Sequence, residues 1–543
     1  MNETTQTPAT IVHGARIVST RAAEHASIAL DTDSALAIAD GRVLARGDDE
    51  QIMALAGPDT ELIDMAGRTV LPGFIETHIH LAHYGANLLE VDCRPTATDS
   101  VAAIQDALRA EAAEPSATEW ILGWGWDESR MAAGAAPTRW DLDAAVSDRP
   151  VLLRRTCAHM AVLNSRALEL AGITDYTPDP DGGRIVRDQS GAATGLVQES
   201  ALNLIPLPAK TNEEVARGIL LAQEQFLSRG LTTVHDMATQ EPDLAALESL
   251  RGHGLRMRVR PWMWALDGNG FQGTLETVTE RGWTSGTGDE LVRIQGMKFM
   301  LDGSVGGRTA AVDEPYEDSA DTGILIHTAD EAAPQVIRAV SHGLRAAIHG
   351  IGDRAVDTAV EVLTRTAQQC PEAATMRNRI EHCALPSRDN LEQMAALGII
   401  AASSVGFLHE LGDSYLANLG PERMARVYPQ ADYAEHGIIA PPNSDCPVTD
   451  SNPWPIIDAS VNRRSLSDQV LDTAQNISLA RAVDGYTRQA AMASFEDGLL
   501  GSLAPGSCAD FIVLDTDPFA DGVDLRKVRV ERTYVDGDCV FTR

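Results

Sequence analysis

The sequence predicts an α/β protein: a distorted (β/α)8 barrel of the TIM type, joined to a small β-sandwich and interrupted by an inserted subdomain. Three observations predict this fold. Short apolar runs alternate with amphipathic helical stretches through the middle of the chain, the same hairpin signal occurs near both ends, and one connection between strands is far too long for a single crossover.

The barrel is predicted from eight apolar runs, most of them separated by stretches of helical periodicity such as residues 213–230 and 353–367. Strands that alternate with helices form parallel sheets, and eight such units close into a barrel. The expected strands are Val70–Ile75, Leu231–His235, Met257–Trp262, Leu291–Met300, Arg345–His349, Asn378–His382, Ile399–Ser404 and Ile438–Asp445.

The sandwich is predicted from two hairpins at opposite ends of the chain. Asp40-Gly41 separates two alternating apolar runs, and Asp536-Gly537 does the same near the C-terminus. Neither short set of strands can bury a core alone, so we expect one composite domain from residues 1–69 and 496–543. The barrel then occupies residues 70–495.

The inserted subdomain is predicted between the first two barrel strands. Residues 84–210 separate these strands, whereas a single crossover needs only a dozen or so residues. This stretch includes "EWILGWGWDES" and "PVLLRRTCAHMAVLNSRALELAGI", which have apolar runs of their own.

The composition excludes some classes of partner. The chain has 44 Lys and Arg against 78 Asp and Glu, a formal net charge of −34, and such a field repels nucleic acids and anionic membranes. No apolar run approaches the 18 or more residues of a membrane span. The first residues, "MNETTQTPATIV", lack the pattern of a secretory signal, and seven scattered cysteines without a C-x-x-C pair fit free thiols, so we expect a cytoplasmic protein.

Histidines mark the end of the first predicted barrel strand, in "VLPGFIETHIHLAHYG". His78 and His80 are two residues apart, so on a strand they face the same side and can converge on one metal ion. The carboxyl ends of barrel strands are where catalytic groups lie. The alternative is a pair of hydrogen-bonded histidines without a metal.

Later strands carry further polar residues at the same relative place. His349, His382 and Asp445 end the fifth, sixth and eighth predicted strands, and Lys298 lies inside the apolar fourth. A charged lysine is costly to bury, so Lys298 needs a partner, a modification or an exit to solvent.

Together these segments resemble the amidohydrolase superfamily, most closely its branch of YtcJ-like hydrolases and N-substituted formamide deformylases. The resemblance spans nearly the whole chain, and its motifs occur in the order of that branch. They are "VLPGFIETHIHL", "GWDES", "NSRALELAGI", "PDGGRIVRDQSGAATGLVQE", "MKFMLDGSVGGRTA", "HGIGDRA", "RIEH", "NSDCPV" and "GSLAPGSCADFIVLD". The family fold, a barrel with a composite β-sandwich, agrees with the fold predicted above.

The resemblance implies a set of metal ligands, namely His78, His80, Lys298, His349, His382 and Asp445. It implies one or two divalent ions, with zinc favoured by neutral imidazoles and carboxylates, although iron or nickel also bind imidazole. Lys298 would be carboxylated and bridge two ions, or stay unmodified beside a single ion. Asp445 would act as general base and then general acid, with His349 as a second catalytic residue.

Substrate contacts are expected from four further residues. His159 matches the "GH…NS" signature of the branch, although Ala158 replaces its usual glycine, and it can equally be satisfied within the inserted subdomain. Trp126 alternates with Trp124 as buried strand residues also do. Arg308 follows a glycine-rich loop and either binds substrate or pairs with Asp302 or Asp353; Asp302 completes the set.

We therefore expect a metal-dependent hydrolase of a non-peptide C–N bond in a small molecule: a linear amide, an N-substituted formamide or an N-acyl amine. The chain is expected to form a homodimer or a higher homo-oligomer. The first alternative is a deaminase or cyclic-amide hydrolase with the same metal site. The second is a non-catalytic ligand-binding protein that keeps the barrel.

Overall fold

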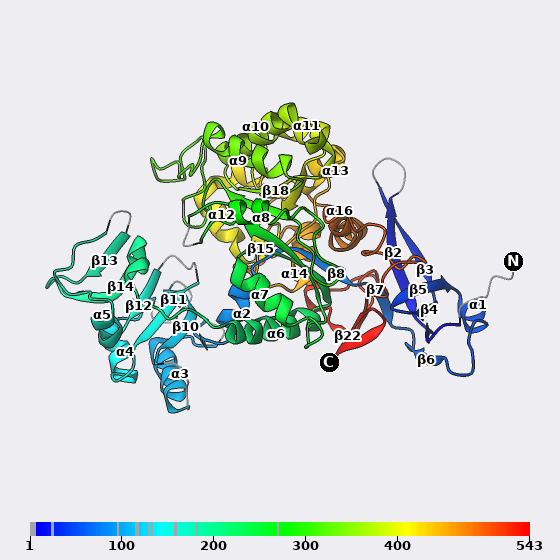
Figure 1. Cartoon of the computed structure of the whole chain (residues 1–543), viewed down its shortest axis with the longest axis horizontal. Helices are drawn as coiled ribbons and strands as arrows, with labels where there is room; N and C mark the ends of the chain where they lie inside the picture. The colour runs from blue at the N-terminus through cyan, green and yellow to red at the C-terminus, as the bar shows by residue number, and fades with distance from the viewer. Residues whose placement is uncertain are drawn as a thin grey trace. The chain divides into compact units, whose positions relative to one another are not determined.

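The structure is a computed structural model that describes residues 7–22, 27–94, 97–114, 119–128, 131, 134–156, 160–180, 183–268 and 271–543. The chain divides into two compact units (Figure 1). The first comprises residues 1–81 and 223–543, and the second comprises residues 82–222. Among the described residues, no helix combines the length and the apolar character that a membrane crossing requires.

The barrel is a parallel sheet with seven regular strands in the order β20-β19-β18-β17-β16-β15-β8. The predicted α/β barrel is thereby confirmed. Its strands are β8 (Phe74–Ile79), β15 (Leu231–Thr239), β16 (Arg258–Trp264), β17 (Gly296–Met300), β18 (Arg345–Gly350), β19 (Arg379–His382) and β20 (Ile400–Ser403).

The eighth predicted strand, Ile438–Asp445, is not a regular strand. Two isolated parallel bridges, Ser403 with Pro442 and Ile79 with Cys446, let this segment lie between β20 and β8 and close the barrel. Pro441 and Pro442 have no backbone N–H, so the segment cannot form a complete ladder. The distortion of the barrel is located here.

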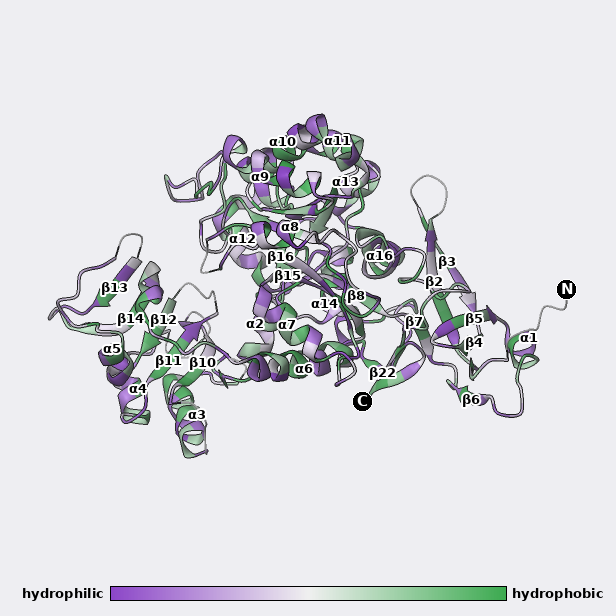
Figure 2. Ribbon diagram, in the orientation of Figure 1, coloured by the Kyte–Doolittle hydropathy of each residue, from purple (hydrophilic) through white to green (hydrophobic). Residues whose placement is uncertain are grey.

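Helices cover the outside of the barrel. The predicted helices 213–230 and 353–367 are confirmed as α6 (Asn212–Ser228) and α10 (Asp353–Gln369). Helices α9 (Ala329–Ser341), α10 and α11 (Arg388–Leu397) carry both hydrophobic and hydrophilic residues (Figure 2), as expected for helices with one face on a sheet. The others are α7 (Glu241–Ser249), α8 (Leu275–Glu280), α12 (Phe407–Met424), α13 (Gln430–Glu435), α14 (Pro453–Asn462), α15 (Leu479–Asp484), a π-helical turn (Gly485–Gln489) and α16 (Ala490–Ala493).

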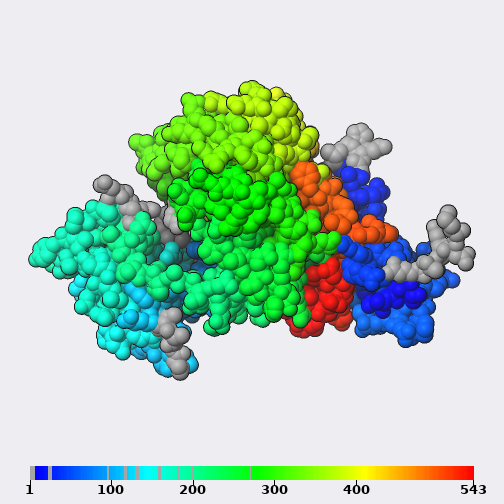
Figure 3. Space-filling view, in the orientation of Figure 1, coloured from blue at the N-terminus to red at the C-terminus, as the bar shows by residue number. Residues whose placement is uncertain are grey.

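The β-sandwich is built from both ends of the chain, as predicted, and blue N-terminal and red C-terminal residues adjoin in Figure 3. One sheet has the order β5-β4-β1-β6 and the other β23-β22-β21-β7-β2-β3. Their strands are β1 (Thr10–His13), β2 (Arg16–Ala22), β3 (Ile28–Asp33), β4 (Ala35–Ala39), β5 (Arg42–Gly47), β6 (Glu61–Asp64), β7 (Thr69–Pro72), β21 (Phe511–Leu514), β22 (Val530–Val535) and β23 (Asp538–Thr542), with the short helix α1 at Asp49–Met53.

Both predicted hairpins of the sandwich are confirmed. Asp40 and Gly41 have φ of 51° and 73°, and Asp536 and Gly537 have φ of 50° and 82°, the positive values that a tight two-residue turn requires. The core between the two sheets includes Leu36 from one end of the chain and Phe511 from the other, both completely buried.

The predicted strand Val70–Ile75 is divided between two sheets. Residues up to Pro72 belong to β7 of the sandwich, and β8 of the barrel begins at Phe74. A Cβ atom on Gly73, between them, would lie 2.4 Å from Oγ1 of Thr232, so only glycine fits where the chain passes from one sheet to the other. Because β8 continues to Ile79, His78 lies within this strand and not after it.

The second unit contains one mixed sheet with the order β13-β14-β12-β11-β10-β9. Its two faces are covered by separate hydrophobic clusters, one including Leu152 and Leu163 and the other Leu153 and Val162, as strand alternation requires. The elements are β9 (Val91–Asp92), α3 (Val101–Ala113), β10 (Ile121–Trp126), α4 (Arg139–Ala145), β11 (Val151–Arg155), β12 (Met160–Leu163), α5 (Ser165–Leu170), β13 (Gly183–Arg187) and β14 (Ala193–Glu199).

A buried ion pair joins the barrel to the sandwich. Arg258 at the start of β16 is 2% exposed, and it donates from Nε and Nη2 to the two carboxylate oxygens of Asp510, at 2.9 and 3.1 Å. The same guanidinium pairs with Asp536 in the hairpin between β22 and β23. The C-terminal strands are thereby fixed to the barrel.

We expect Arg258→Ala to lower the free energy of unfolding by about 3–5 kcal/mol, because it leaves the Asp510 carboxylate buried without a cation to pair with. The change is measured by urea denaturation. Arg21→Ala is the matched control, since Arg21 pairs with Asp31 on the surface, and it should cost less than about 1 kcal/mol. Equal losses in the two variants would contradict the role of the buried pair.

Candidate metal centre

The imidazole of His78 is hydrogen-bonded to a carboxylate on another strand. Its Nδ1 lies 2.6 Å from Oε2 of Glu381 on β19, and both side chains are buried. An ionised carboxylate only accepts hydrogen bonds, so Nδ1 of His78 carries the proton. Its Nε2 is then unprotonated and available to a metal.

Glu381 is kept ionised by Arg379 of the same strand. Nε and Nη2 of Arg379 donate to the two oxygens of Glu381, each at 2.7 Å. Burial favours the neutral acid, but Arg379 and the His78 hydrogen bond hold the pKa of Glu381 well below its usual value. This carboxylate–imidazole arrangement is common among the histidine ligands of metals.

His80 and His382 are fixed in the same tautomer as His78. Nδ1 of His80 donates to the carbonyl oxygen of Met237 on β15, at 2.9 Å. Nδ1 of His382 lies 2.7 Å from Oγ of Ser404, whose own proton goes to Oδ1 of Asn443, so His382 must be the donor. In their neutral form, all three imidazoles therefore have an unprotonated Nε2.

These unprotonated nitrogens face the carboxylate of Asp445. Oδ1 of Asp445 lies 3.0 Å from Nε2 of His80 and 3.3 Å from Nε2 of His78, yet no hydrogen bond to it is found among the described residues. The ligand atoms of His78, His382 and Asp445 all lie within 4.8 Å of one another. Lone pairs that face each other in a buried site without a proton between them require a cation, so this donor set fits a divalent metal ion.

Asp445 reaches this position because its segment is bound to β8. The backbone N–H of Asp445 donates to the carbonyl of His78, and the N–H of His80 donates to the carbonyl of Cys446. The buried carboxylate of Glu76 accepts from the N–H groups of both His78 and Ser444, each at 3.2 Å. The segment therefore has the place of a barrel strand although it lacks the regular ladder.

The backbone is strained at two of the predicted ligands. His382 and Asp445 have φ of 65° and 54°, in the left-handed region that costs a residue other than glycine about 1–3 kcal/mol. Such outliers cluster at functional sites, where they aim a side chain that a regular strand would direct elsewhere.

His349 lies beside His382, with 4.4 Å between the ring centroids. Its Nε2 lies 3.2 Å from the carbonyl oxygen of Gly303 and 3.2 Å from Oδ1 of Asp302. A metal would therefore be bound through the other ring nitrogen, with Nε2 protonated.

The expected substrate contact by Asp302 is replaced by a structural role. The carboxylate accepts from the backbone N–H groups of Ala311, Ile351 and Gly352 at 2.8–3.0 Å, and it is fully buried. It joins the loops that follow β17 and β18, and it orients His349.

Lys298 lies on β17, in register with Ala347 of β18, and is 2% exposed. Among the residues that the structure describes, no hydrogen bond or ion pair of its amine is found. Burial lowers the pKa of Lys298 to about 8, with Glu381 and Asp445 opposing the shift. The lysine therefore lies near the predicted ligands in an environment that disfavours its charge.

The other three residues predicted to contact substrate lie in different environments. Arg308 donates from Nε to Oδ1 of Asn418 at 2.9 Å, and neither of the suggested ion pairs, with Asp302 or with Asp353, forms in the described part of the chain. Trp126 is 1% exposed in the core of the second unit and donates to the carbonyl of Leu153, which is the position of a core residue. His159 lies outside the described residues.

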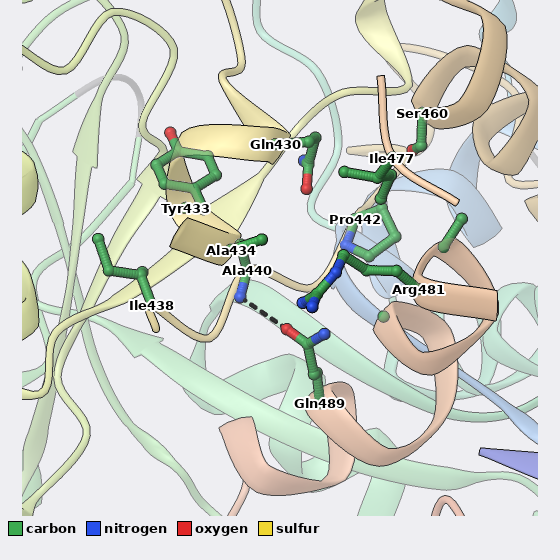
Figure 4. Close-up of a pocket in the computed structure, with 12 residues that line it drawn as sticks. Gln430, Tyr433, Ala434, Ile438, Ala440, Pro442, Ser460, Ile477, Arg481 and Gln489 are labelled. Carbon is green, nitrogen blue, oxygen red and sulfur yellow. Dashed lines mark hydrogen bonds between the residues drawn. The ribbon is translucent and has the colours of Figure 1, made fainter. Parts of the chain in front are cut away.

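Two other features are distinct from this centre. The ligand atoms of Cys508, Asp510 and Asp536 also lie close together, but the guanidinium of Arg258 already pairs with both carboxylates. A small hollow, partly open to solvent, lies beside the segment that leads to Asp445 (Figure 4). There Oε1 of Gln489 accepts from the N–H of Ala440 and helps to hold that segment in place.

The residues that support the ligands were not predicted from the sequence. Glu381 and Arg379 could have been noticed as two charged residues on the same face of a buried strand, where each needs a partner. Glu76, Ser404 and the carbonyl of Met237 gave no comparable signal.

Comparison with known proteins identifies relatives along almost the entire chain. It is 29% identical over 531 residues to the putative amidohydrolase YtcJ of Bacillus subtilis, covering 94% of this chain and 97% of that protein. It is 26% identical to the N-substituted formamide deformylase of Arthrobacter pascens, covering 94% and 95%.

Solved structures give the same result. A metal-dependent hydrolase from Pyrococcus horikoshii superimposes with a TM-score of 0.78 at 29% identity, over 95% of this chain and 99% of that chain. One from Pyrococcus furiosus gives 0.76 at 30%, over 94% and 100%. The model described as the amidohydrolase family matches residues 61–541, and the chain therefore belongs to the amidohydrolase family.

Proposed function

We propose that this chain is a metal-dependent hydrolase that cleaves a non-peptide C–N bond in a linear amide, such as an N-substituted formamide or an N-acyl amine. The observation that carries the proposal is the group of unprotonated imidazole nitrogens that faces the carboxylate of Asp445. The similarity to an N-substituted formamide deformylase over 94% of the chain supports the choice of substrate class.

The ligands of the proposed centre are His78, His80, His349, His382 and Asp445. Neutral imidazoles with a carboxylate suit Zn2+. An ion bound there would lower the pKa of a water molecule toward neutrality and polarise the amide carbonyl. We further propose that Lys298 is carboxylated, which would replace a buried amine by an anion and allow a second ion.

Asp445 moves the proton. A carboxylate with an ordinary pKa of about 4 is ionised at neutral pH, so Asp445 is ready to accept a proton. It takes the proton from the attacking water and delivers it to the leaving nitrogen, so that an amine departs and a carboxylic acid remains. Its backbone hydrogen bond to His78 keeps the carboxylate beside the reacting groups.

Metal analysis and product analysis together test the proposal. Protein purified without added metal should contain one or two divalent ions per chain by elemental analysis. In a panel of N-substituted formamides, N-acyl amines, cyclic amides and amino-substituted heterocycles, it should release formate or another acid from the linear amides, and removal of the ion by a chelator should stop the reaction.

The other functions give different results. Ammonia released from the heterocycles, without acid, would assign a deaminase, and a ring-opened product alone would assign a cyclic-amide hydrolase. Absence of both metal and turnover would leave a ligand-binding protein and overturn the proposal.

We expect Asp445→Asn to lower kcat by about 10²–10⁴-fold, because the amide has the size of the carboxylate but cannot accept the proton. The metal content should stay close to that of the parent protein, since other ligands remain. Asp330→Asn is the matched control, because Asp330 is 86% exposed and should not affect kcat. A near-normal kcat in Asp445→Asn would remove this residue from the mechanism.

We expect Lys298→Ala to lose at least one metal ion per chain, because the proposed bridging carbamate cannot form. Lys298→Met is the second variant: it fills most of the space and removes the amine, so loss of metal in both variants cannot be attributed to a cavity. The stoichiometry is measured after loading with and without bicarbonate. Unchanged metal content in both variants would support a single ion without a bridging lysine.

A further inference from the structure

The interior of this barrel beneath the candidate centre is unusually charged. Barrel interiors are ordinarily filled by layers of branched apolar side chains. Here Arg260, Arg345 and Arg379 lie on β16, β18 and β19 with at most 2% exposure. Glu496 pairs with Arg260 and Glu381 with Arg379, but no ion pair of Arg345 is found among the described residues. Burial and the nearby Arg379 lower the pKa of Arg345 well below its ordinary value, so the adjacent cations Arg345 and Arg379 need a further compensating group.

Trp262 provides that compensation for two of the arginines. Its indole ring on β16 is fully buried, and the Cζ atoms of Arg345 and Arg379 each lie 5.0 Å from the ring centroid. A guanidinium over the face of an indole is attracted by the electron density of the ring, most strongly where water is excluded. Tryptophan offers the most favourable ring for this contact.

Arg379 links Trp262 to the hydrogen-bond partner of His78. Besides its two bonds to Glu381, it donates to the carbonyl of Thr77 at 2.8 Å and to Nδ1 of His235 at 2.9 Å. All three nitrogen atoms of the guanidinium therefore donate hydrogen bonds, and its Cζ atom lies over the ring of Trp262. Glu381 in turn holds Nδ1 of His78, so the orientation of that imidazole depends on the arginine.

A second route leads from Trp262 to His80. Met237 of β15 lies opposite Trp262 in the ladder of β15 and β16, and the two side chains pack together with Ala347. The carbonyl of Met237 is the acceptor for Nδ1 of His80. The same tryptophan therefore contacts the supports of both histidines of the H-x-H pair.

The two guanidinium contacts distinguish Trp262 from a tryptophan that only fills the core. Nε1 of Trp262 is buried and has no hydrogen-bond partner in the described part of the chain, a cost that phenylalanine would not incur. The larger, more electron-rich ring offsets this cost through its contacts with Arg345 and Arg379.

We propose that Trp262 is a positioning residue of the metal centre, which fixes the Nε2 atoms of His78 and His80 through Arg379–Glu381 and through the Met237 carbonyl. The proposal rests on the proposed function, because it assumes that these nitrogens bind a metal. Trp262 is not itself a candidate ligand, so any effect of its replacement on metal binding must be transmitted through these supports.

The test compares Trp262→Phe, Trp262→Leu and Trp262→Met in the full-length chain. The Kd for Zn2+ is measured by competition with a chelating dye, and the visible spectrum of the Co2+-loaded protein reports the ligand geometry. We expect Leu and Met to weaken the Kd by about 10-fold or more and to change the spectrum, as loss of support behind metal ligands does. Phenylalanine keeps a ring face and should restore most of the affinity.

Trp454→Leu is the matched control. Trp454 on α14 is also buried, and its indole N–H likewise has no hydrogen-bond partner among the described residues, but it packs edge-on against Phe74. It should lower the melting temperature as Trp262→Leu does and leave the Kd and the Co2+ spectrum unchanged. If Trp262→Leu does not fold, Trp262→Met serves in its place, because methionine fills irregular space without a ring face.

The outcomes separate this proposal from the proposed function. Parent-like Kd and spectrum in the Leu and Met variants, with a loss of thermal stability equal to that of the control, would reduce Trp262 to a core residue and overturn the inference while leaving the hydrolase intact. A parent protein that binds no metal would instead overturn the proposed function.

Discussion

The candidate centre depends on one property of the imidazole ring, which in its neutral form has a single N–H. When that proton is bound to a fixed acceptor, the other nitrogen must present a lone pair. His78, His80 and His382 each donate from Nδ1, to a carboxylate, a carbonyl and a hydroxyl. Their Nε2 atoms and Asp445 then form a set that only a cation stabilises, and the surrounding structure serves to maintain it.

The barrel supplies these acceptors because it brings distant strands together. The acceptor for His78 of β8 is on β19, and that for His80 is on the neighbouring β15. Asp445 arrives on a segment with two prolines, which closes the barrel through two bridges instead of a full ladder. The irregular closure leaves Asp445 free to adopt a strained backbone and turn toward the histidines. The distortion of the fold and the chemistry of the site therefore have the same origin.

The sequence predicted those features that depend on local pattern. Alternation identified the strands and Asp-Gly pairs identified the hairpins, and the polar residues His349, His382 and Asp445 that end apolar runs lie together with His78 in the structure. Features that depend on tertiary contacts could not be read from local pattern. No pattern reveals that three backbone N–H groups converge on Asp302, and Glu381 was overlooked because its partner His78 is about 300 residues away.

The charge of the protein is distributed in a way that suits the proposed reaction. Three guanidinium groups, those of Arg260, Arg345 and Arg379, lie inside the barrel, where Glu381 and Glu496 neutralise part of their charge, whereas the chain as a whole has a net charge of −34. The negative field raises the local concentration of divalent cations and repels anions. Hydrolysis of a neutral amide leaves a carboxylate, so the same field that favours loading of the metal also favours departure of the acid. The same negative field would repel an anionic ligand, so it would not help a protein that binds one. The net charge therefore agrees with the proposed reaction of a neutral substrate.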